Sequence, residues 1–141
     1  MANKRFDDGA IVDYPYLWGW QSDQGQVDGD KSRPACLAAV IFDARQDIHH
    51  LVILAISGTA PKGAQSAIEI PSLELRRAGI DTLKQGWVTT SEYNYDVLER
   101  SYYFEPGQRP RGHFTKAFMR RIVEALRPMI AAKTGRIDRR E

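Results

Sequence analysis

Two cationic residues, Lys31 and Arg33, stand where a long polar stretch of the chain gives way to an apolar run. A guanidinium stays charged at physiological pH, and its planar fork matches two oxygens of one phosphate group. We therefore single out Arg33 as the residue best suited to bind a phosphate. The alternative is that Arg33 forms a surface salt bridge with Asp28 or Asp30, which would do no chemistry.

Two hydroxyl groups and a lysine follow the next apolar run, at Ser57, Thr59 and Lys62. If the two apolar runs form antiparallel neighbouring strands, the start of one lies beside the end of the other. Arg33 would then lie close to Ser57 and Thr59, with room for a phosphate between them. The alternative is that both hydroxyls only bond backbone groups of the turn, the commoner role of Ser and Thr beside Gly and Pro.

Aromatic residues gather in the polar stretch that precedes Arg33. Trp18 and Trp20 lie there, directly after Tyr14 and Tyr16. Proteins that bind single-stranded nucleic acid commonly stack aromatic side chains on unpaired bases. The two tryptophans could serve in this way, or they could clamp the loop to the body of the protein.

A group that could accept a proton is harder to identify. His49 and His50 precede the strand that ends at Ser57, so about 3.3 Å of strand per residue separates them from the hydroxyl, and we expect a surface role for both. Three carboxylates remain as possible general bases: Asp28, Asp30 and Glu92. Each of them could instead be solvated or paired in a salt bridge.

The single cysteine, Cys36, lies inside an apolar run. This position is typical of a small buried hydrophobic residue rather than a catalytic thiol. One cysteine cannot form an intramolecular disulfide or a cysteine-rich zinc cluster. We expect no cofactor.

The spacing of the apolar residues predicts a mainly β chain. Short strands are expected at residues 10–14, 35–42, 51–57, 67–70, 86–90 and 101–104. Residues 15–32 form an unusually long polar connection, and loops of that length are usually functional or disordered. Residues 71–79 favour a short helix with Ser72 as its cap and Gly79 as its end. Several short strands at this spacing are typical of a small β-barrel.

The last quarter of the chain has a different pattern. Apolar residues recur every four positions from Phe114 to Ile130, which predicts an amphipathic helix, and Pro128 predicts a kink or break near Arg127. Residues 1–105 contain 10 Lys and Arg and 15 Asp and Glu, whereas residues 106–141 contain 10 and 3. A basic tail could contact a polyanion or an acidic protein, or it could be a solvated helix face with a frayed end.

A chain of 141 residues with 43% hydrophobic residues is the size of one domain. We divide it into an N-terminal tail (1–8), a barrel (9–105) and a basic C-terminal helix and tail (106–141) of the same domain. The longest apolar run, residues 35–42, is too short to span a bilayer. A cytoplasmic location is therefore expected.

Several motifs, taken in their order along the chain, resemble the PemK/MazF family of toxins over about residues 9–105. These motifs are Gly9, Ile11 and Val12; Lys31, Arg33 and Pro34; Ile56 and Ser57 followed by Lys62 and Gly63; and Trp87, Val88, Thr89, Glu92, Tyr93 and Asn94. In this resemblance Arg33 matches the catalytic arginine of the family. Ser57 matches the position of its hydroxyl residue, with Thr59 as the alternative.

The resemblance implies an SH3-like small β-barrel with short helices and a C-terminal amphipathic helix, acting as a homodimer. It implies a toxin of a type II toxin-antitoxin system, an mRNA interferase that cuts single-stranded RNA without a metal through attack by the ribose 2′-hydroxyl. The partners would be the RNA and a cognate antitoxin protein, with no membrane. Lys31, Lys62, Trp18 and Trp20 would bind the RNA.

Two functions of other classes remain as alternatives. One is a non-enzymatic poison of the same barrel type that binds a protein target, like CcdB. That toxin ends in Trp-Gly-Ile, whereas this chain ends in residues 135–141 with no such tail. The other is an SH3-like module that only binds peptides, which would need its aromatic residues but not Arg33 beside Ser57.

Overall fold

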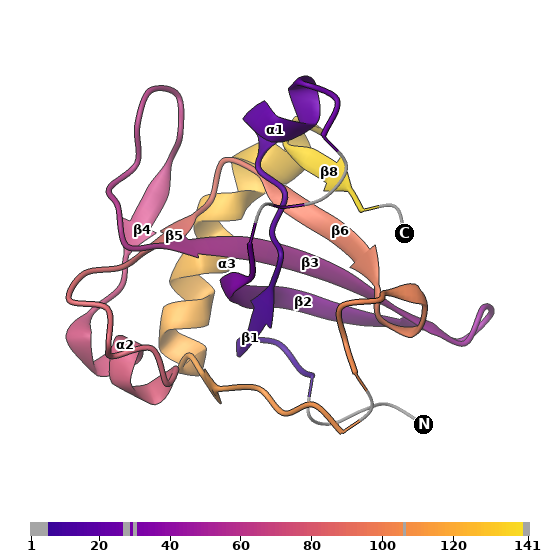
Figure 1. The fold of residues 1–141 in the computed structure, drawn as a ribbon, viewed down its shortest axis with the longest axis horizontal. Coiled ribbons are helices and arrows are strands. Elements are labelled where there is room, and N and C mark those ends of the chain that lie inside the picture. The colour runs from indigo at the N-terminus through magenta and orange to yellow at the C-terminus, as the bar shows by residue number, and fades with distance from the viewer. Residues whose placement is uncertain (1–5, 27–28, 30, 106, 140–141) are drawn as a thin grey trace.

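The computed structural model describes residues 6–26, 29, 31–105 and 107–139 (Figure 1). Within these residues the strands are β1 (Ala10–Tyr14), β2 (Arg33–Asp43), β3 (Ile48–Ser57), β4 (Ala67–Glu69), β5 (Trp87–Thr89), β6 (Tyr93–Val97), β7 (Gly112–His113) and β8 (Arg136–Asp138). The helices are α1 (Gly19–Asp23), α2 (Ser72–Arg77) and α3 (Lys116–Ala131), with a 3-10 turn η1 (Leu98–Arg100). Asp28 and Asp30 lie outside the described residues.

The long strands β2 and β3 form the centre of a curled, mainly antiparallel sheet shaped like half a barrel (Figure 1). They pair in antiparallel register from Ala35 opposite Ala55 to Asp43 opposite Ile48, which confirms the predicted arrangement of the two apolar runs. The strand order is β4-β5-β3-β2-β1-β7, and β6 also pairs with β3. The chain is thus mainly β with few helices, as the sequence predicts.

Both faces of the central strands are largely buried at residues 35–38 of β2 and 51–56 of β3, which explains why these segments are continuously apolar. At the outer end of β2, Ile41 and Phe42 are exposed. One face packs on α3, and its core includes Cys36, Leu54 and Ile56 from the sheet with Phe118, Ile122 and Leu126 from the helix. The opposite face packs on Tyr14, Tyr16, Tyr103 and Phe104. Cys36 is fully buried, as predicted, and burial raises the pKa of its thiol.

Helix α3 continues past Pro128 to Ala131, so the predicted break near Arg127 is wrong. Pro128 cannot bond to the carbonyl of Glu124, but both residues are exposed and water can satisfy that carbonyl. Ile122 and Leu126 on the opposite side of the helix are buried. Burial of each such side chain contributes about 1.5–3 kcal/mol, and this packing holds the helix together.

The strand predicted at residues 101–104 is wrong, and the strand in this region is β6. Its pattern is hard to recognise because two polar residues, Asn94 and Asp96, point into the core. Each has a buried partner: Asn94 bonds to the backbone of Leu17, and Asp96 accepts a hydrogen bond of 2.7 Å from the Tyr14 hydroxyl. Buried polar groups are tolerated when they are paired in this way.

The basic tail forms β8, which pairs in parallel with β6. Arg139 is buried, donates a hydrogen bond of 2.7 Å to the carbonyl of Pro15 and lies over the Tyr14 ring. Arg136 pairs with Asp138 at 2.6 Å. This part of the tail is therefore not frayed, and these two arginines make contacts within the fold.

Two shorter elements also differ in detail from the prediction. Helix α2 begins at Ser72, so its N-cap is Pro71 rather than Ser72. Gly79 follows the end of α2 with a φ of 72°, a conformation that favours glycine, and it ends the helix as predicted. The polar connection 15–32 contains the single-turn helix α1. In the described part of the chain, no helix is long and apolar enough to cross a membrane.

Candidate functional site

All three tryptophans of the chain line one groove of about 370 Å³, which we call the tryptophan groove. Its lining residues are Trp18, Trp20, Ser57, Thr59, Ala60, Pro61, Lys62, Gln65, Ala67, Trp87 and Thr89. They come from the loop around α1, the end of β3 with the loop that follows it, and strands β4 and β5. Five residues singled out in the sequence therefore meet here: Trp18, Trp20, Ser57, Thr59 and Lys62.

Arg33 lies beside this groove at the start of β2. Its neighbour in β1 is Tyr14, and continuing the β2-β3 register by two residues places Arg33 opposite Ser57. The guanidinium carbon lies 5.3 Å from the centre of the Trp18 ring, a cation-π distance. The Nε of Arg33 is buried and has no hydrogen-bond partner among the described residues.

An unpartnered buried donor carries a free-energy cost, because it has lost its hydrogen bonds to water. A phosphate oxygen would satisfy the Arg33 Nε and pair with the charge of the guanidinium. The described residues include no carboxylate paired with Arg33, so the predicted alternative of a salt bridge to Asp28 or Asp30 falls on residues outside the described part of the chain.

Both candidate hydroxyl residues line the groove. The Oγ of Ser57 accepts a hydrogen bond of 3.0 Å from the backbone N–H of Thr59, which is the turn contact given as the alternative in the sequence. This bond uses an acceptor position of Ser57 and leaves its hydroxyl hydrogen able to donate. The geometry places both Ser57 and Thr59 at the site.

The two candidate lysines differ in position. Lys62 lines the tryptophan groove from the loop after β3. Lys31 is exposed and does not line the groove. The structure therefore brings Lys62, but not Lys31, to the site.

The loop with Trp18 and Trp20 is held against the start of β6. Asn94 accepts a bond of 2.9 Å from Leu17 N and donates one of 2.7 Å to Leu17 O. Glu92 Oε2 accepts bonds from Gly19 N at 2.9 Å and from the Tyr16 hydroxyl at 3.1 Å. Burial raises the pKa of Glu92 above its ordinary value, while these two bonds act in the opposite direction.

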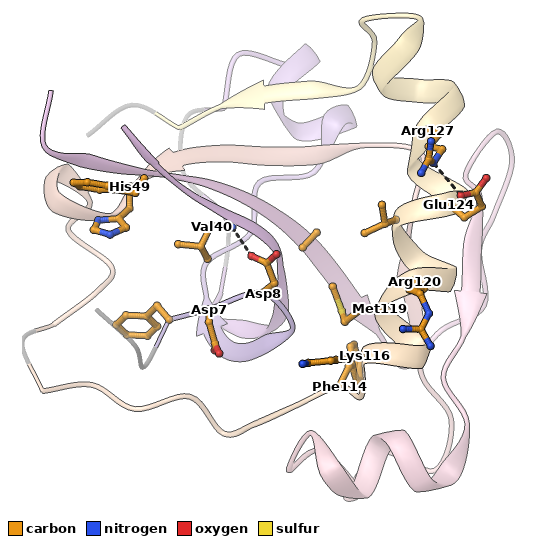
Figure 2. A pocket seen from close by; sticks show the side chains of 14 residues that line it. Asp7, Asp8, Val40, His49, Phe114, Lys116, Met119, Arg120, Glu124 and Arg127 are labelled. Atoms are coloured by element: carbon orange, nitrogen blue, oxygen red, sulfur yellow. Dashed lines mark hydrogen bonds and ion pairs between the residues drawn. The ribbon is translucent and has the colours of Figure 1, made fainter. Parts of the chain in front are cut away.

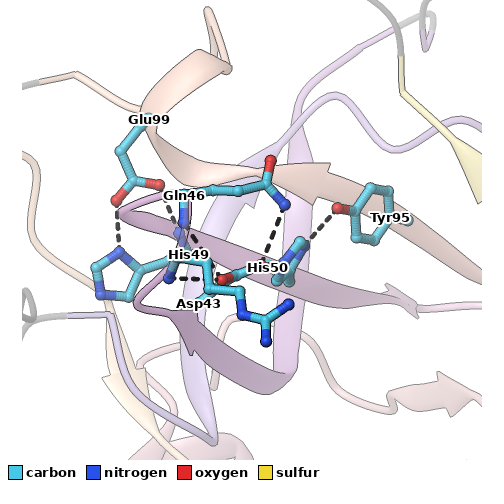
Figure 3. Close-up of polar contacts among 7 residues, drawn as sticks. Asp43, Gln46, His49, His50, Tyr95 and Glu99 are labelled. Carbon is cyan, nitrogen blue, oxygen red and sulfur yellow. Dashed lines mark hydrogen bonds and ion pairs between the residues drawn. The ribbon is translucent and has the colours of Figure 1, made fainter.

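The surface role predicted for His49 and His50 is wrong for His49, which is buried, while His50 is half-buried. Figure 3 shows the polar contacts of both. His49 is buried, and its Nδ1 lies 2.5 Å from Glu99 Oε2. His50 is half-buried between Tyr95 and Asp43, and its hydrogen bond lowers the pKa of Asp43. Both lie within β3, and His49 is about 26 Å of extended strand from Ser57, so they lie apart from the hydroxyl as expected.

A second and larger hollow of about 850 Å³ lies between α3, β2 and the segment before β1, and we call it the α3 groove (Figure 2). It is lined by apolar residues (Phe6, Ala38, Val40, Phe42, Phe114, Met119 and Val123), by His49, and by charged residues (Asp7, Asp8, Lys116, Arg120, Glu124 and Arg127). None of these side chains carries a hydroxyl or a thiol. Several charges are paired within the fold: Glu124 with Arg127 at 2.9 Å, and Asp7 with His113 at 2.7 Å.

The sequence did not indicate Trp87 and Gln65 as members of the site. Trp87 reaches the groove because β5 pairs with the end of β3, where Ser57 lies opposite Trp87. Which strand occupies that edge of β3 depends on tertiary pairing that no local pattern encodes. The useful signal was that Trp87 belongs to one of the family-like motifs.

Comparison of the chain with protein-family models, with curated proteins and with solved structures gave no significant match.

Proposed function

We propose that this chain is the toxin of a type II toxin-antitoxin system, a PemK/MazF-like mRNA interferase that cleaves single-stranded RNA without a metal or cofactor. The observation that carries the proposal is Arg33. Its Nε is buried without a partner in the described residues, and its guanidinium lies against Trp18 of the tryptophan groove. Ser57, Thr59 and Lys62 line the same groove.

The groove fits a single strand better than a duplex. Stacking of an aromatic side chain on an unpaired base contributes about 1–3 kcal/mol, and it requires a base whose face is free. Trp20 is 54% exposed and available for such a contact, while Trp18 and Trp87 are partly buried at the walls. Lys62 adds a positive charge that would pair with a backbone phosphate.

In the proposed reaction the ribose 2′-oxygen attacks the adjacent phosphorus. The bond from O2′ to phosphorus forms as the bond from phosphorus to O5′ breaks, a base takes the 2′-hydroxyl proton, and the leaving oxygen receives a proton. Arg33 would stabilise the negative charge of the phosphorane, assisted by the Ser57 or Thr59 hydroxyl. The products are a 2′,3′-cyclic phosphate and a 5′-hydroxyl.

The proposal includes an SH3-like barrel, a homodimer and a cytoplasmic location, where mRNA is translated. It also includes an acidic, partly disordered antitoxin as partner. The exposed Trp20 and the edge strand β4, which pairs on one side with β5, are surfaces that a partner would cover.

Incubation of the purified chain with a long RNA in EDTA tests the proposal. We expect cuts at short recurring sequences that leave 2′,3′-cyclic phosphate and 5′-hydroxyl ends. Products with a 5′-phosphate, or activity abolished by EDTA, would exclude this mechanism. Growth arrest on expression without any RNA cleavage would favour a non-enzymatic poison of the CcdB type.

A further inference from the structure

The turn that carries Trp18 and Trp20 is held by contacts with the residues before and within β6. Asn94, which is fully buried, pairs with both backbone groups of Leu17. Glu92 holds the next part of the turn, because its Oε2 accepts hydrogen bonds from Gly19 N and the Tyr16 hydroxyl. Gly19 is the residue between the two tryptophans, so this bond fixes the backbone from which both rings project.

The contact between Glu92 and Gly19 is close. A Cβ added to Gly19 would lie 3.1 Å from Glu92 Oε1, tighter than ordinary van der Waals contact. A side chain at position 19 would therefore push the carboxylate away or displace the turn. The Tyr16 ring also contacts the Trp18 ring, with centroids 5.1 Å apart, so the bond to the Tyr16 hydroxyl supports Trp18 from a second side.

These contacts bear on the role of Glu92, which the sequence offered as a possible general base. The oxygen Oε2 is engaged with two donors of the turn, and Glu92 is not among the residues that line the tryptophan groove. A general base must lie within hydrogen-bond reach of the proton that it removes.

We propose that Glu92 is a positioning residue that holds the turn with Trp18 and Trp20 in place for stacking on unpaired bases, and that it is not the general base. The nature of the ligand rests on the proposed function. The fixing of the two tryptophans rests only on the contacts of Glu92 with Gly19 and Tyr16.

Two substitutions separate the two roles. Glu92→Gln keeps the size of the side chain and a carbonyl oxygen that accepts hydrogen bonds, but it cannot take a proton. Glu92→Ala removes the acceptor altogether. A positioning residue is rescued by Gln, whereas a general base is lost in both variants. Gly19→Ala disturbs the same contact from the other side, and Glu124→Ala removes an exposed carboxylate of the α3 groove as a matched control.

Tryptophan fluorescence reports on the turn directly, since all three tryptophans line the groove. Acrylamide quenching is measured on the free variants, and binding is measured with a 2′-deoxy oligonucleotide, which lacks the attacking hydroxyl. Glu92→Ala and Gly19→Ala should change quenching and weaken binding about tenfold, the value of one lost stacking contact. Glu92→Gln and Glu124→Ala should stay within about twofold of the parent chain in quenching, binding and cleavage.

Loss of cleavage in Glu92→Gln with retained binding would make Glu92 the base and overturn the inference. Unchanged quenching in both Glu92→Ala and Gly19→Ala would also overturn it. If Glu92→Ala does not fold, the quenching and binding of Gly19→Ala alone decide whether the inference holds. If quenching follows the expected order but the parent chain binds no oligonucleotide, the positioning role stands and the proposed function fails.

Discussion

The two grooves of this protein differ in volume and in the chemistry of the residues that line them. The α3 groove is the larger, at about 850 Å³ against about 370 Å³, and its lining is mostly apolar. The tryptophan groove is lined by hydroxyls, a lysine and aromatic rings, and Arg33 lies against one of those rings. The α3 groove resembles a binding surface, and the tryptophan groove has groups that suit chemistry on a phosphate.

The charged side chains of the two grooves also differ in whether they have hydrogen-bond or ion-pair partners. In the α3 groove, Glu124 and Arg127 satisfy each other, and Asp8 accepts a hydrogen bond from the backbone of Val40. Beside the tryptophan groove, the Nε of Arg33 has no such partner in the described residues. The α3 groove also has a buried nitrogen without a partner among the described residues, His49 Nε2, but the tryptophan groove brings hydroxyls and a lysine together beside the Arg33 Nε. The smaller groove is therefore the better candidate for a phosphate site.

Arg33→Lys should distinguish the two grooves by a large loss of cleavage. The substitution keeps the positive charge but loses the planar fork, so a phosphate gripped by two nitrogens would be held poorly. We expect cleavage to fall by about a hundredfold, within the range for loss of a transition-state contact. The control is Arg120→Lys in the α3 groove, which should cleave at the parental rate. Equal losses of cleavage rate in Arg33→Lys and Arg120→Lys would show that the tryptophan groove is no better a candidate for the active site than the α3 groove.

Met119→Ala should act on stability rather than on cleavage. Met119 is buried against Cys36 and lines the α3 groove, so its truncation enlarges a cavity in the core. Such changes cost about 2–5 kcal/mol of unfolding free energy. Chemical denaturation should show this loss, while the cleavage rate per folded molecule stays unchanged. A large fall in that rate would mean that the α3 groove contributes to the reaction.

The two hydroxyl residues should give a smaller effect and settle which of them acts. A hydrogen bond to a charged group such as the phosphorane contributes about 1.5–3 kcal/mol, so the variant that lacks the acting hydroxyl should slow cleavage by about ten- to a hundredfold. Ser57→Ala also removes the acceptor for Thr59 N, and its melting temperature should be measured alongside. A loss confined to Thr59→Ala would assign the role to Thr59. If Ser57→Ala and Thr59→Ala both cleave RNA at the parental rate, neither hydroxyl takes part in the reaction.

The smallest effect expected is a pH dependence of stability from Glu92. Because burial raises the pKa of this carboxyl in the folded chain, the folded state binds the proton more tightly than the unfolded state. The contribution of protonated Glu92 to the free energy of unfolding is therefore fully present below the pKa that this carboxyl has in the unfolded chain. It is lost as the pH rises through the pKa that the carboxyl has in the folded chain. Denaturation of the parent and Glu92→Gln at pH 4 and pH 7 checks this. The parent should lose stability relative to the variant at the higher pH, and the opposite sign would contradict the burial of the charge.

The sequence predicts the centre of this fold well and its periphery poorly. The inner parts of β2 and β3 are continuous apolar runs with both faces buried, and such runs are recognisable. The sequence pattern does not reveal β6, because its inward positions are Asn94 and Asp96, whose partners come from distant parts of the chain. The surface role predicted for His49 is wrong because β3 begins at Ile48, earlier than the apolar run indicates, and brings His49 beside Glu99, 50 positions further along.

The candidate site shows the same contrast between features that local sequence patterns predict and features that depend on tertiary pairing. The position of Arg33 and Ser57 at adjoining strand ends could be predicted, because antiparallel pairing of two recognisable strands is enough to bring their ends together. The place of Trp87 and the role of Glu92 could not, because they depend on which segments lie beside the end of β3 and beside the α1 turn. Local sequence patterns give no information about that choice.

The most direct test of the central claim is the rate at which Arg33→Ala cleaves a single-stranded RNA in EDTA, measured with its melting temperature. Because the buried Nε of Arg33 has no partner in the described residues, removing the guanidinium should cost the fold little, and the melting temperature should stay near the parental value. The rate should fall about a hundred- to thousandfold, as expected for loss of about 3–4 kcal/mol of transition-state stabilisation. A folded Arg33→Ala variant that cleaves as fast as the parent would show that the tryptophan groove with Arg33 is not the active site.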